Sequence, residues 1–241
     1  MKKQTLLRFL GTILFSIGTL LGLFLLVVTV WGDLESTFFA STLEAEKTLH
    51  SLRCPILISS NEVGQIKATL KNPLEKDWER FVRVNISDKY ITLRREIKGN
   101  VQIPAGGKET ITWDIYPENA VYNRFIFANI YVNAKYPYPS LGGSCGVFLL
   151  DLWNLTGNQS LVLIIFSSLL TLTIGVILWK MNTKTREGRI WYTYRSMIGL
   201  AVIVYVGLVI GYFGAWVFAL LFLVIALLLT GIIIGRKLSS Y

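Results

Sequence analysis

A run of forty residues, from Ser196 to Gly235, contains no charged side chain. As a single α-helix it would be about 60 Å long, twice the roughly 30 Å apolar core of a bilayer. The segment GYFGAW, at residues 211–216, combines glycines that tolerate turn dihedrals with aromatic side chains that favour a membrane interface. The run therefore predicts two membrane-spanning helices joined by an outer turn at 211–216.

Two further apolar blocks, Phe9–Val30 and Leu161–Trp179, are each long enough for one span. The composition agrees, because 53% of the residues are hydrophobic and 16% are charged, against about 25% charged in a typical soluble domain. A cleaved signal peptide is the alternative for the first block, although that block is longer than the usual apolar region and no A-x-A site follows. We predict a four-helix membrane bundle with spans over residues 9–31, 160–179, 196–212 and 215–235.

The net charge of +9 is distributed unevenly. Residues 32–159 hold 14 Lys and Arg against 14 Asp and Glu, so the whole excess lies in 1–8, 180–195 and 236–241. Four spans place these basic segments on one side, which the positive-inside rule makes cytoplasmic. We predict a multi-pass protein of the cell membrane with both termini cytoplasmic and residues 32–159 extracytoplasmic. This charge distribution predicts contact between the basic segments and the lipid bilayer, and it argues against binding to nucleic acid.

The extracytoplasmic region shows a period-two pattern. In RFVRVNIS, Val82, Val84 and Ile86 alternate with other residues, and the stretches 66–70, 111–115 and 126–132 alternate in the same way. Turns rich in Gly, Pro and Asn separate them, which is typical of an antiparallel β-sandwich, here over about 54–150. Ser41 and Glu44 have the spacing of a capping box, which predicts a short helix over about 42–51.

Two stretches of this region, EVGQIKATLKNP at 62–73 and VQIPAGGKETITWDI at 101–115, resemble bacterial immunoglobulin-like adhesion and stalk modules. The resemblance covers roughly 60 residues. It implies an Ig-like sandwich and no active site.

The two cysteines, Cys54 and Cys145, flank the expected β region. Disulfides persist outside the cytoplasm, so we predict a structural disulfide that ties the two ends of the domain together. Such a bridge closes a loop of about 90 residues. The chain-entropy model predicts that it stabilises the folded domain by about 4–5 kcal/mol. Two free thiols or a redox pair are the alternatives, but the spacing is not that of a C-x-x-C motif.

Motifs for chemistry are missing from the sequence. The only histidine, His50, has no zinc-site spacing around it, and there is no P-loop, GxSxG or HExxH pattern. The expected spans hold no ionisable residue in their interiors, although transport usually needs one. A pore lined by the hydroxyl groups of Ser167, Ser168, Thr171 and Thr173 is the alternative. We predict a protein that is not an enzyme and that binds no cofactor and no metal.

Six glycines in the expected spans have the G-x-x-x-G spacing that lets helix backbones approach closely. They are Gly18 and Gly22, Gly207 and Gly211, and Gly231 and Gly235. They pack either within the bundle or against another membrane subunit or a second copy. Outside the membrane, Trp78, Tyr136 and Tyr138 either cover the sandwich core or contact a partner.

These observations predict a non-enzymatic membrane protein whose β-sandwich serves as an interaction or assembly module. An accessory subunit of a membrane or envelope complex fits this description. A transporter or channel component with the sandwich as a vestibule is the alternative.

Overall fold

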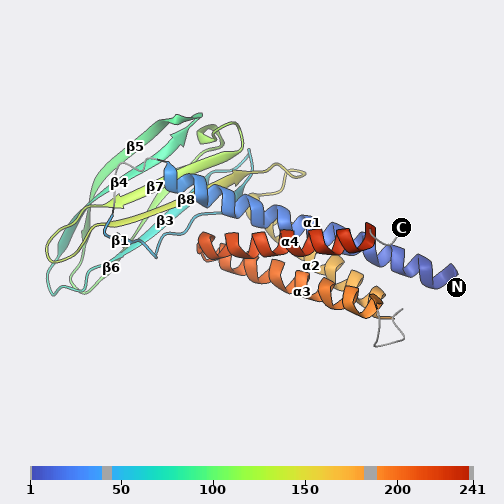
Figure 1. Cartoon of the computed structure of the whole chain (residues 1–241). Helices are drawn as coiled ribbons and strands as arrows, with labels where there is room; N and C mark the ends of the chain where they lie inside the picture. The colour runs from blue at the N-terminus through green and yellow to red at the C-terminus, as the bar shows by residue number, and fades with distance from the viewer. Residues whose placement is uncertain (1, 40–44, 182–188, 239–241) are drawn as a thin grey trace. The chain divides into compact units, whose positions relative to one another are not determined.

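The computed structural model describes residues 2–39, 45–181 and 189–238 of the chain. The chain divides into two compact units, one of residues 1–30 and 162–241 and one of residues 31–161. We call the first the helical unit and the second the β unit. Figure 1 shows the elements of both, four long helices and a region that is mostly antiparallel sheet.

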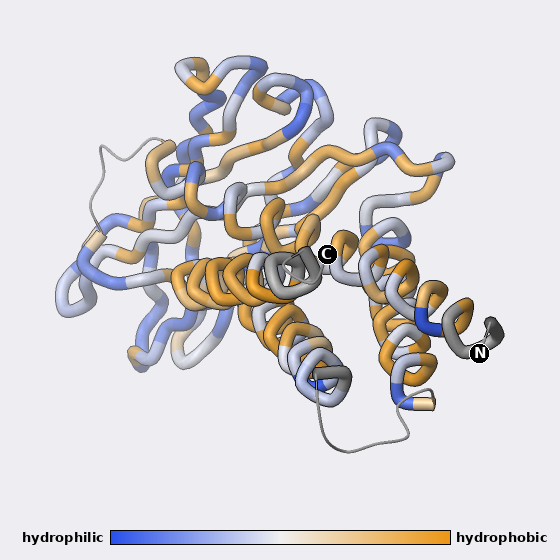
Figure 2. Tube along the Cα trace, turned by 45° about the vertical axis from the view of Figure 1, so that its right-hand side comes forward, coloured by the Kyte–Doolittle hydropathy of each residue, from blue (hydrophilic) through white to orange (hydrophobic). Residues whose placement is uncertain are grey.

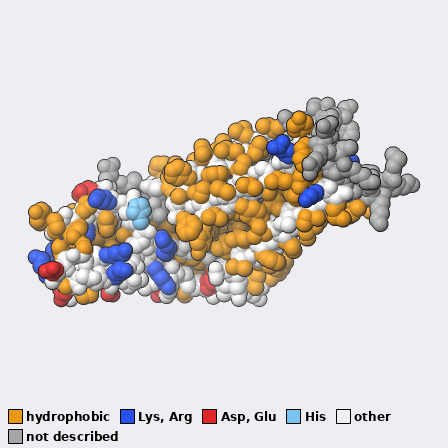
Figure 3. All heavy atoms as spheres, turned by 90° about the horizontal axis from the view of Figure 1, so that it is seen from below, with side chains coloured by type: hydrophobic (Ala, Val, Ile, Leu, Met, Phe, Trp, Pro, Cys, Tyr) orange, Lys and Arg blue, Asp and Glu red, His pale blue; other side chains and the backbone are white. Residues whose placement is uncertain are grey.

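The four helices are α1 (Lys2–Phe38), α2 (Gly157–Met181), α3 (Arg189–Tyr212) and α4 (Trp216–Leu238). Each is long and apolar enough to cross a membrane, and Figure 2 shows apolar residues along all four. Figure 3 shows apolar side chains covering most of the visible helical surface, whereas charged side chains gather over the strands. The prediction of four long apolar helices is confirmed.

Helix α1 runs further than the span expected at 9–31. It continues through a polar segment to Phe38, where the hydroxyl groups of Ser36 and Thr37 donate to backbone carbonyls one turn earlier. These hydroxyl groups bond to carbonyls of their own helix, so they need no partner from another element. The last turns of α1, from Trp31, belong to the β unit.

The forty-residue run forms two helices, as predicted, with a turn at 213–215. Gly214 has a φ of +77°, a conformation that glycine adopts without steric cost. The Gly214 N–H donates to Gly211 O at 2.8 Å, and the Ala215 N–H donates to Ile210 O at 3.3 Å. This pair of bonds is a Schellman motif, which ends α3 and satisfies two of its terminal carbonyls.

All four helices contribute to one buried cluster in the helical unit. Its members include Leu26 of α1, Leu172 of α2, Val204 of α3 and Ala219 of α4. Polar bonds also cross between helices, because the Ser168 hydroxyl donates to the carbonyl of Gly18 at 2.8 Å. The helical unit is therefore a packed bundle.

The first of the three predicted glycine pairs, Gly18 and Gly22, lies where helices approach closely. A Cβ atom on Gly18 would lie 2.6 Å from Thr171 Oγ1 and 2.8 Å from the backbone nitrogen of Leu172. A Cβ atom on Gly22 would lie 2.6 Å from a methyl carbon of Val204. The first pair of glycines therefore lets α1 approach both α2 and α3.

The other two pairs differ from each other. A Cβ atom on Gly207 would lie 3.0 Å from Phe222 and 3.1 Å from Leu26, and one on Gly211 would lie 3.3 Å from Thr29. Gly231 instead faces open space within 4 Å, and the surroundings of Gly235 lie outside the described residues.

Its described residues give the β unit eight strands and a short 3₁₀-helix. They are β1 (Lys47–Thr48), β2 (Leu57–Ile58), β3 (Gly64–Lys71), β4 (Trp78–Asp88), β5 (Tyr90–Ile103), β6 (Lys108–Ile115), η1 (Pro117–Asn119), β7 (Phe125–Val132) and β8 (Leu141–Leu149). One sheet has the order β1-β8-β7-β4-β5, with β2 also beside β8, and the second sheet pairs β3 with β6.

The two sheets share one apolar core, which makes this unit a β-sandwich, as predicted. Ile66 and Ala68 of β3 belong to the same buried cluster as Val84 of β4, Ile130 of β7 and Val147 of β8. Each of these residues has the inward parity of its strand, since successive side chains point to opposite faces. The alternation in the sequence therefore identified the buried faces.

Two expectations for the β unit need correction. The sandwich is not antiparallel throughout, because β1 and β2 both pair in parallel with β8. The helix expected over about 42–51 is absent from its described part, residues 45–51, which contain β1 and a turn. There the Leu49 N–H donates to Gly142 O at 2.7 Å, so pairing with β8 satisfies the backbone in place of a helix. Residues 40–44 lie outside the described residues.

We predict that Gly18→Ala destabilises the helical unit by about 1–3 kcal/mol, because the added methyl group overlaps the backbone of α2. Gly231→Ala is the matched control, with open space for the methyl group, and should be neutral or slightly stabilising since alanine favours helix. Thermal unfolding of the two variants in detergent, followed by far-UV circular dichroism, measures the difference. Equal midpoints would show that α1 and α2 are not in close contact at Gly18.

Candidate functional site

The candidate site lies at one end of the sandwich, which we call the Tyr136 end. It consists of the segments 72–77, 104–107 and 133–140, which join β3 to β4, β5 to β6 and β7 to β8. All three predicted contact residues, Trp78, Tyr136 and Tyr138, lie in this end or at its border.

Trp78 and Tyr138 pack against each other at the edge of the sandwich core. Their ring centroids are 5.0 Å apart, and Trp78 is 6% exposed. Trp78 belongs to the buried cluster, and Tyr138 packs against that cluster. Both rings therefore cover the core, the role that was one of the two alternatives for them.

Arg80 is a buried cation beside the Trp78 ring, with 3% of its surface exposed. Its guanidinium carbon lies 4.5 Å from the centroid of the Trp78 ring. Its Nε and Nη2 atoms donate to Asn133 O, and Nη2 also donates to Pro139 O at 2.9 Å. Burial lowers the pKa of Arg80, but a guanidinium remains protonated in proteins.

These bonds hold both ends of the segment 133–139. Between them, Lys135 and Tyr138 exchange two backbone hydrogen bonds, of 3.1 and 2.9 Å, and so close a tight turn. Tyr136 stands at the tip of that turn with 97% of its surface exposed. The site is therefore an exposed tyrosine on a turn whose two ends are hydrogen-bonded to a buried arginine.

The neighbouring segments are held in the same way. Asn72 is buried, and its amide nitrogen donates to the carbonyls of Lys76, Ile103 and Pro104. The Asp77 carboxylate accepts the N–H of Ala105 at 3.0 Å. Side-chain bonds of this kind order a loop that lacks regular secondary structure.

Arg80 was missed in the sequence, although a signal for it was present. It has the same parity as Val82, Val84 and Ile86 in β4, so the period-two pattern points it inward. A charged residue on an inward face needs buried acceptors, and backbone carbonyls of a neighbouring loop supply them here.

The predicted disulfide between Cys54 and Cys145 is confirmed. Cys145 of β8 is in the buried cluster, and Cys54 packs against it. The bridge thus joins the segment that precedes β3 to the last strand of the sandwich. No group of three or more His, Cys, Asp or Glu side chains able to hold a metal ion occurs among the described residues.

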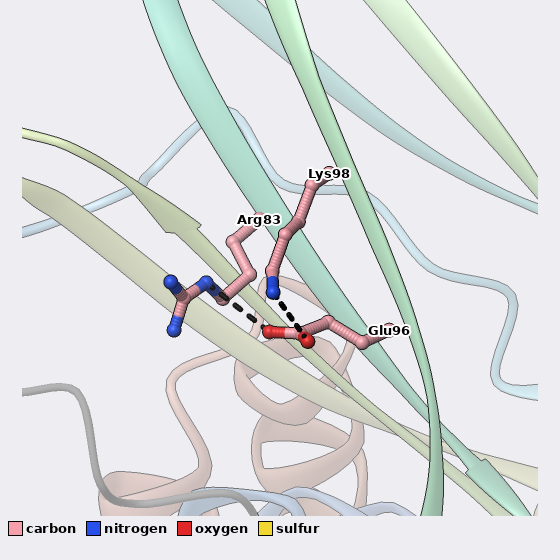
Figure 4. A network of polar contacts seen from close by, with 3 residues as sticks. All are labelled: Arg83, Glu96 and Lys98. Carbon is pink, nitrogen blue, oxygen red and sulfur yellow. Dashed lines mark ion pairs between the residues drawn. The ribbon is translucent and has the colours of Figure 1, made fainter.

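The outer face of β4 and β5 carries a small ion-pair network (Figure 4). Glu96 lies 3.2 Å from Arg83 Nε and 2.7 Å from Lys98 Nζ. The hydrogen bond from Lys98, followed by the charges of Lys98 and Arg83, lowers the pKa of Glu96. All three side chains are partly exposed, so solvent weakens the pairs.

Comparison with known proteins found no matching family model and no matching curated protein. Solved structures match only in part. A cycloisomaltooligosaccharide glucanotransferase from Paenibacillus is 12% identical, with 46% of this chain and 15% of the other covered (TM-score 0.33). A β-glucosidase from Listeria innocua is 16% identical, with 41% of this chain and 15% of the other covered (TM-score 0.28). The CARDB domain of a Pyrococcus furiosus protein, solved with di-metal ions, is 13% identical, with 41% of this chain and 84% of the other covered (TM-score 0.31). Similarity at this level assigns no function to the chain.

We predict that Arg80→Met destabilises the β unit by about 2–4 kcal/mol, because it leaves two backbone carbonyls without a donor. Arg83→Met, on the same strand, is the matched control and should cost much less, since its ion pair is partly exposed to solvent. Denaturant unfolding in detergent, followed by tryptophan fluorescence, compares the variants. Similar losses for both would contradict the role of Arg80 in holding the turn.

Proposed function

We propose that this chain is a non-enzymatic integral membrane protein whose extracytoplasmic, Ig-like sandwich is an interaction and assembly module. Four spans anchor it, and both termini are cytoplasmic. It acts as an accessory subunit of a membrane or envelope complex. The four apolar helices and the basic segments between and beside them support this assignment.

The observation that carries the proposal is Tyr136. Tyrosine is enriched at binding hot spots, because it offers a large contact area and loses little conformational entropy on binding. Tyr136 is almost fully exposed on a turn that Arg80 already fixes. A partner that binds this turn would not have to order it first.

The hydroxyl groups of the helices favour an anchor over a pore. The Thr171 hydroxyl donates to the carbonyls of Ser167 and Ser168, and the Thr173 hydroxyl donates to that of Leu169. Ser168 donates to Gly18 O and is buried. These groups serve packing and local bonding, so the transporter or channel alternative gains no support from them.

The proposed topology predicts that Phe213→Cys, in the turn between α3 and α4, reacts with a membrane-impermeant maleimide added outside intact cells. Phe213 is 69% exposed. Met181→Cys, 71% exposed at the end of α2, is the matched control and should react only after permeabilisation. Labelling of both positions from the same side would overturn the four-span topology.

The proposed interaction predicts that a photo-crosslinking amino acid at Tyr136 gives a discrete adduct in native membranes. The same amino acid at Lys67, an exposed residue in the middle of β3 and away from the Tyr136 end, is the control and should not give that adduct. Tyr136→Ala should also lower the mass of the complex measured in native detergent, while leaving the unfolding midpoint unchanged. An unchanged complex in Tyr136→Ala would show that the turn is not the contact.

A further inference from the structure

The exposed apolar side chains of the sandwich gather at one end. Of the eight large apolar side chains exposed between residues 45 and 156, only Tyr136 lies at the Tyr136 end. The other seven lie in the segments 59–63, 88–93, 116–124 and 150–156, which we call the helix-linked end. The most prominent are Tyr90 at 60%, Tyr122 at 72% and Trp153 at 83% exposed.

The backbone of the helix-linked end is unusual at the same places. Among the described residues, the non-glycine residues with positive φ are Lys89, Tyr122, Asn123, Trp153 and Asn154. All five lie in the three turns that carry these aromatic side chains. A left-handed conformation costs an ordinary residue about 1–2 kcal/mol, and it is least expected for bulky residues. The sandwich core does not include Tyr122 or Trp153, so their cost is not offset by packing in that core.

Hydrogen bonds place the turns beside the last strand. The Leu149 N–H, at the end of β8, donates to Arg124 O at 2.7 Å, which brings the Tyr122 turn alongside that end. In the hairpin that carries Tyr90, Ser87 accepts the N–H of Phe127 and donates to Asn119 O. The turns that carry Tyr90 and Tyr122 therefore lie at the end of the sheet where β8 stops.

The chain passes from this end directly into α2. Trp153 lies four residues before Gly157, so their Cα atoms are at most about 14 Å apart. The Glu62 carboxylate accepts the N–H of Gly157 at 2.6 Å and that of Ser59 at 2.8 Å, which holds the first residue of α2 to the sandwich. Trp153 is thus within a few residues of a helix that is apolar enough to span a membrane, and the turns of Tyr90 and Tyr122 lie at the same end of the sandwich.

We propose that Tyr90, Tyr122 and Trp153 lie in the headgroup region of the bilayer in which the chain is anchored, so that the helix-linked end is a lipid-contacting surface. The inference rests on the membrane anchoring proposed above. Tyrosine and tryptophan combine an apolar ring with a polar atom, and both concentrate at membrane interfaces.

The charges nearby are of both signs. The segments of the helix-linked end hold Lys89 and Arg124 against four acidic residues, which are Glu62, Asp88, Glu118 and Asp151. Attraction of anionic headgroups is therefore not the main contribution to lipid binding. The main contribution is the partition of the aromatic rings into the interface. Zwitterionic phosphatidylcholine is sufficient as the lipid.

A nitroxide label on single new cysteines tests the proposal in the full chain, reconstituted in phosphatidylcholine vesicles. Cys54 and Cys145 are bridged, so the label reacts at the new thiol. The positions are Tyr122, Trp153, Tyr136 and the exposed α4 residue Leu228. The measurement is the ratio of collisions with oxygen, which partitions into lipid, to collisions with a water-soluble nickel chelate.

We expect this ratio to be several-fold higher at Tyr122→Cys and Trp153→Cys than at Tyr136→Cys. Equal ratios at all three positions would overturn the proposal. Protection of 122 and 153 from both reagents would also overturn it, because that result indicates a protein subunit as the occupant. A water-like ratio at Leu228→Cys would instead refute the membrane anchoring itself, which keeps the two failures distinct.

A second measurement avoids cysteine substitution in the strained turns. Brominated phosphatidylcholine quenches tryptophan fluorescence near the interface. We expect Trp153→Phe, which keeps an aromatic ring, to reduce the quenched signal, and Trp78→Phe at the other end of the sandwich to leave it unchanged. No reduction in Trp153→Phe would contradict the lipid contact.

Discussion

The apolar layer between the two sheets is the contact on which the rest of the β unit depends. A sheet of only two strands, such as β3 with β6, is marginal in water by itself. It is held here because Ile66 and Ala68 are buried in one cluster with residues of β4, β7 and β8. Cys145 lies in the same layer, so the disulfide ties the segment before β3 to that core. Once this layer is formed, the positions of the loops at both ends of the sandwich follow.

The two ends use aromatic residues in opposite ways. At the Tyr136 end, two of the three rings cover the core, and buried Arg80 and Asn72 satisfy the loop carbonyls. One tyrosine is left exposed on an ordered turn. At the helix-linked end, several rings are exposed, and two of them occupy left-handed backbone positions. This contrast is the physical basis for proposing a protein partner at one end and lipid at the other.

The helical unit is held together by close approach and by hydroxyl groups. In the proposed membrane location, apolar helices gain little hydrophobic driving force for association, so van der Waals contact and hydrogen bonds carry more of it. Gly18 and Gly22 bring α1 against α2 and α3, and Gly175 of α2 lies near the backbone of Phe15. Trp179 Nε1 also donates to Thr12 Oγ1 at 3.2 Å across the helices. Gly175 was not noticed in the sequence, because a lone glycine in an apolar run has no spacing that marks it.

The sequence by itself determined the number of long helices and the inward faces of the strands. The forty-residue run was too long for one span, and the parity of Val82, Val84 and Ile86 marked the buried side of β4. Both signals are local, because a helix or strand repeats over a few residues whatever it packs against. The parity even placed Arg80 inward, but only the fold supplied the Asn133 and Pro139 carbonyls that accept its N–H groups.

Tertiary structure alone decided the rest. The capping-box spacing at Ser41 and Glu44 predicted a helix, yet residues 47–48 pair with β8, because a long-range partner can outweigh a local preference. Local sequence made Trp78 and Tyr136 equal candidates for a contact, but in the fold Trp78 is buried and Tyr136 is exposed. The same holds for the glycines, since Gly18 and Gly231 look alike in sequence and differ only in what lies across from them. What a residue faces depends on distant parts of the chain, and the spacing of its neighbours does not contain that information.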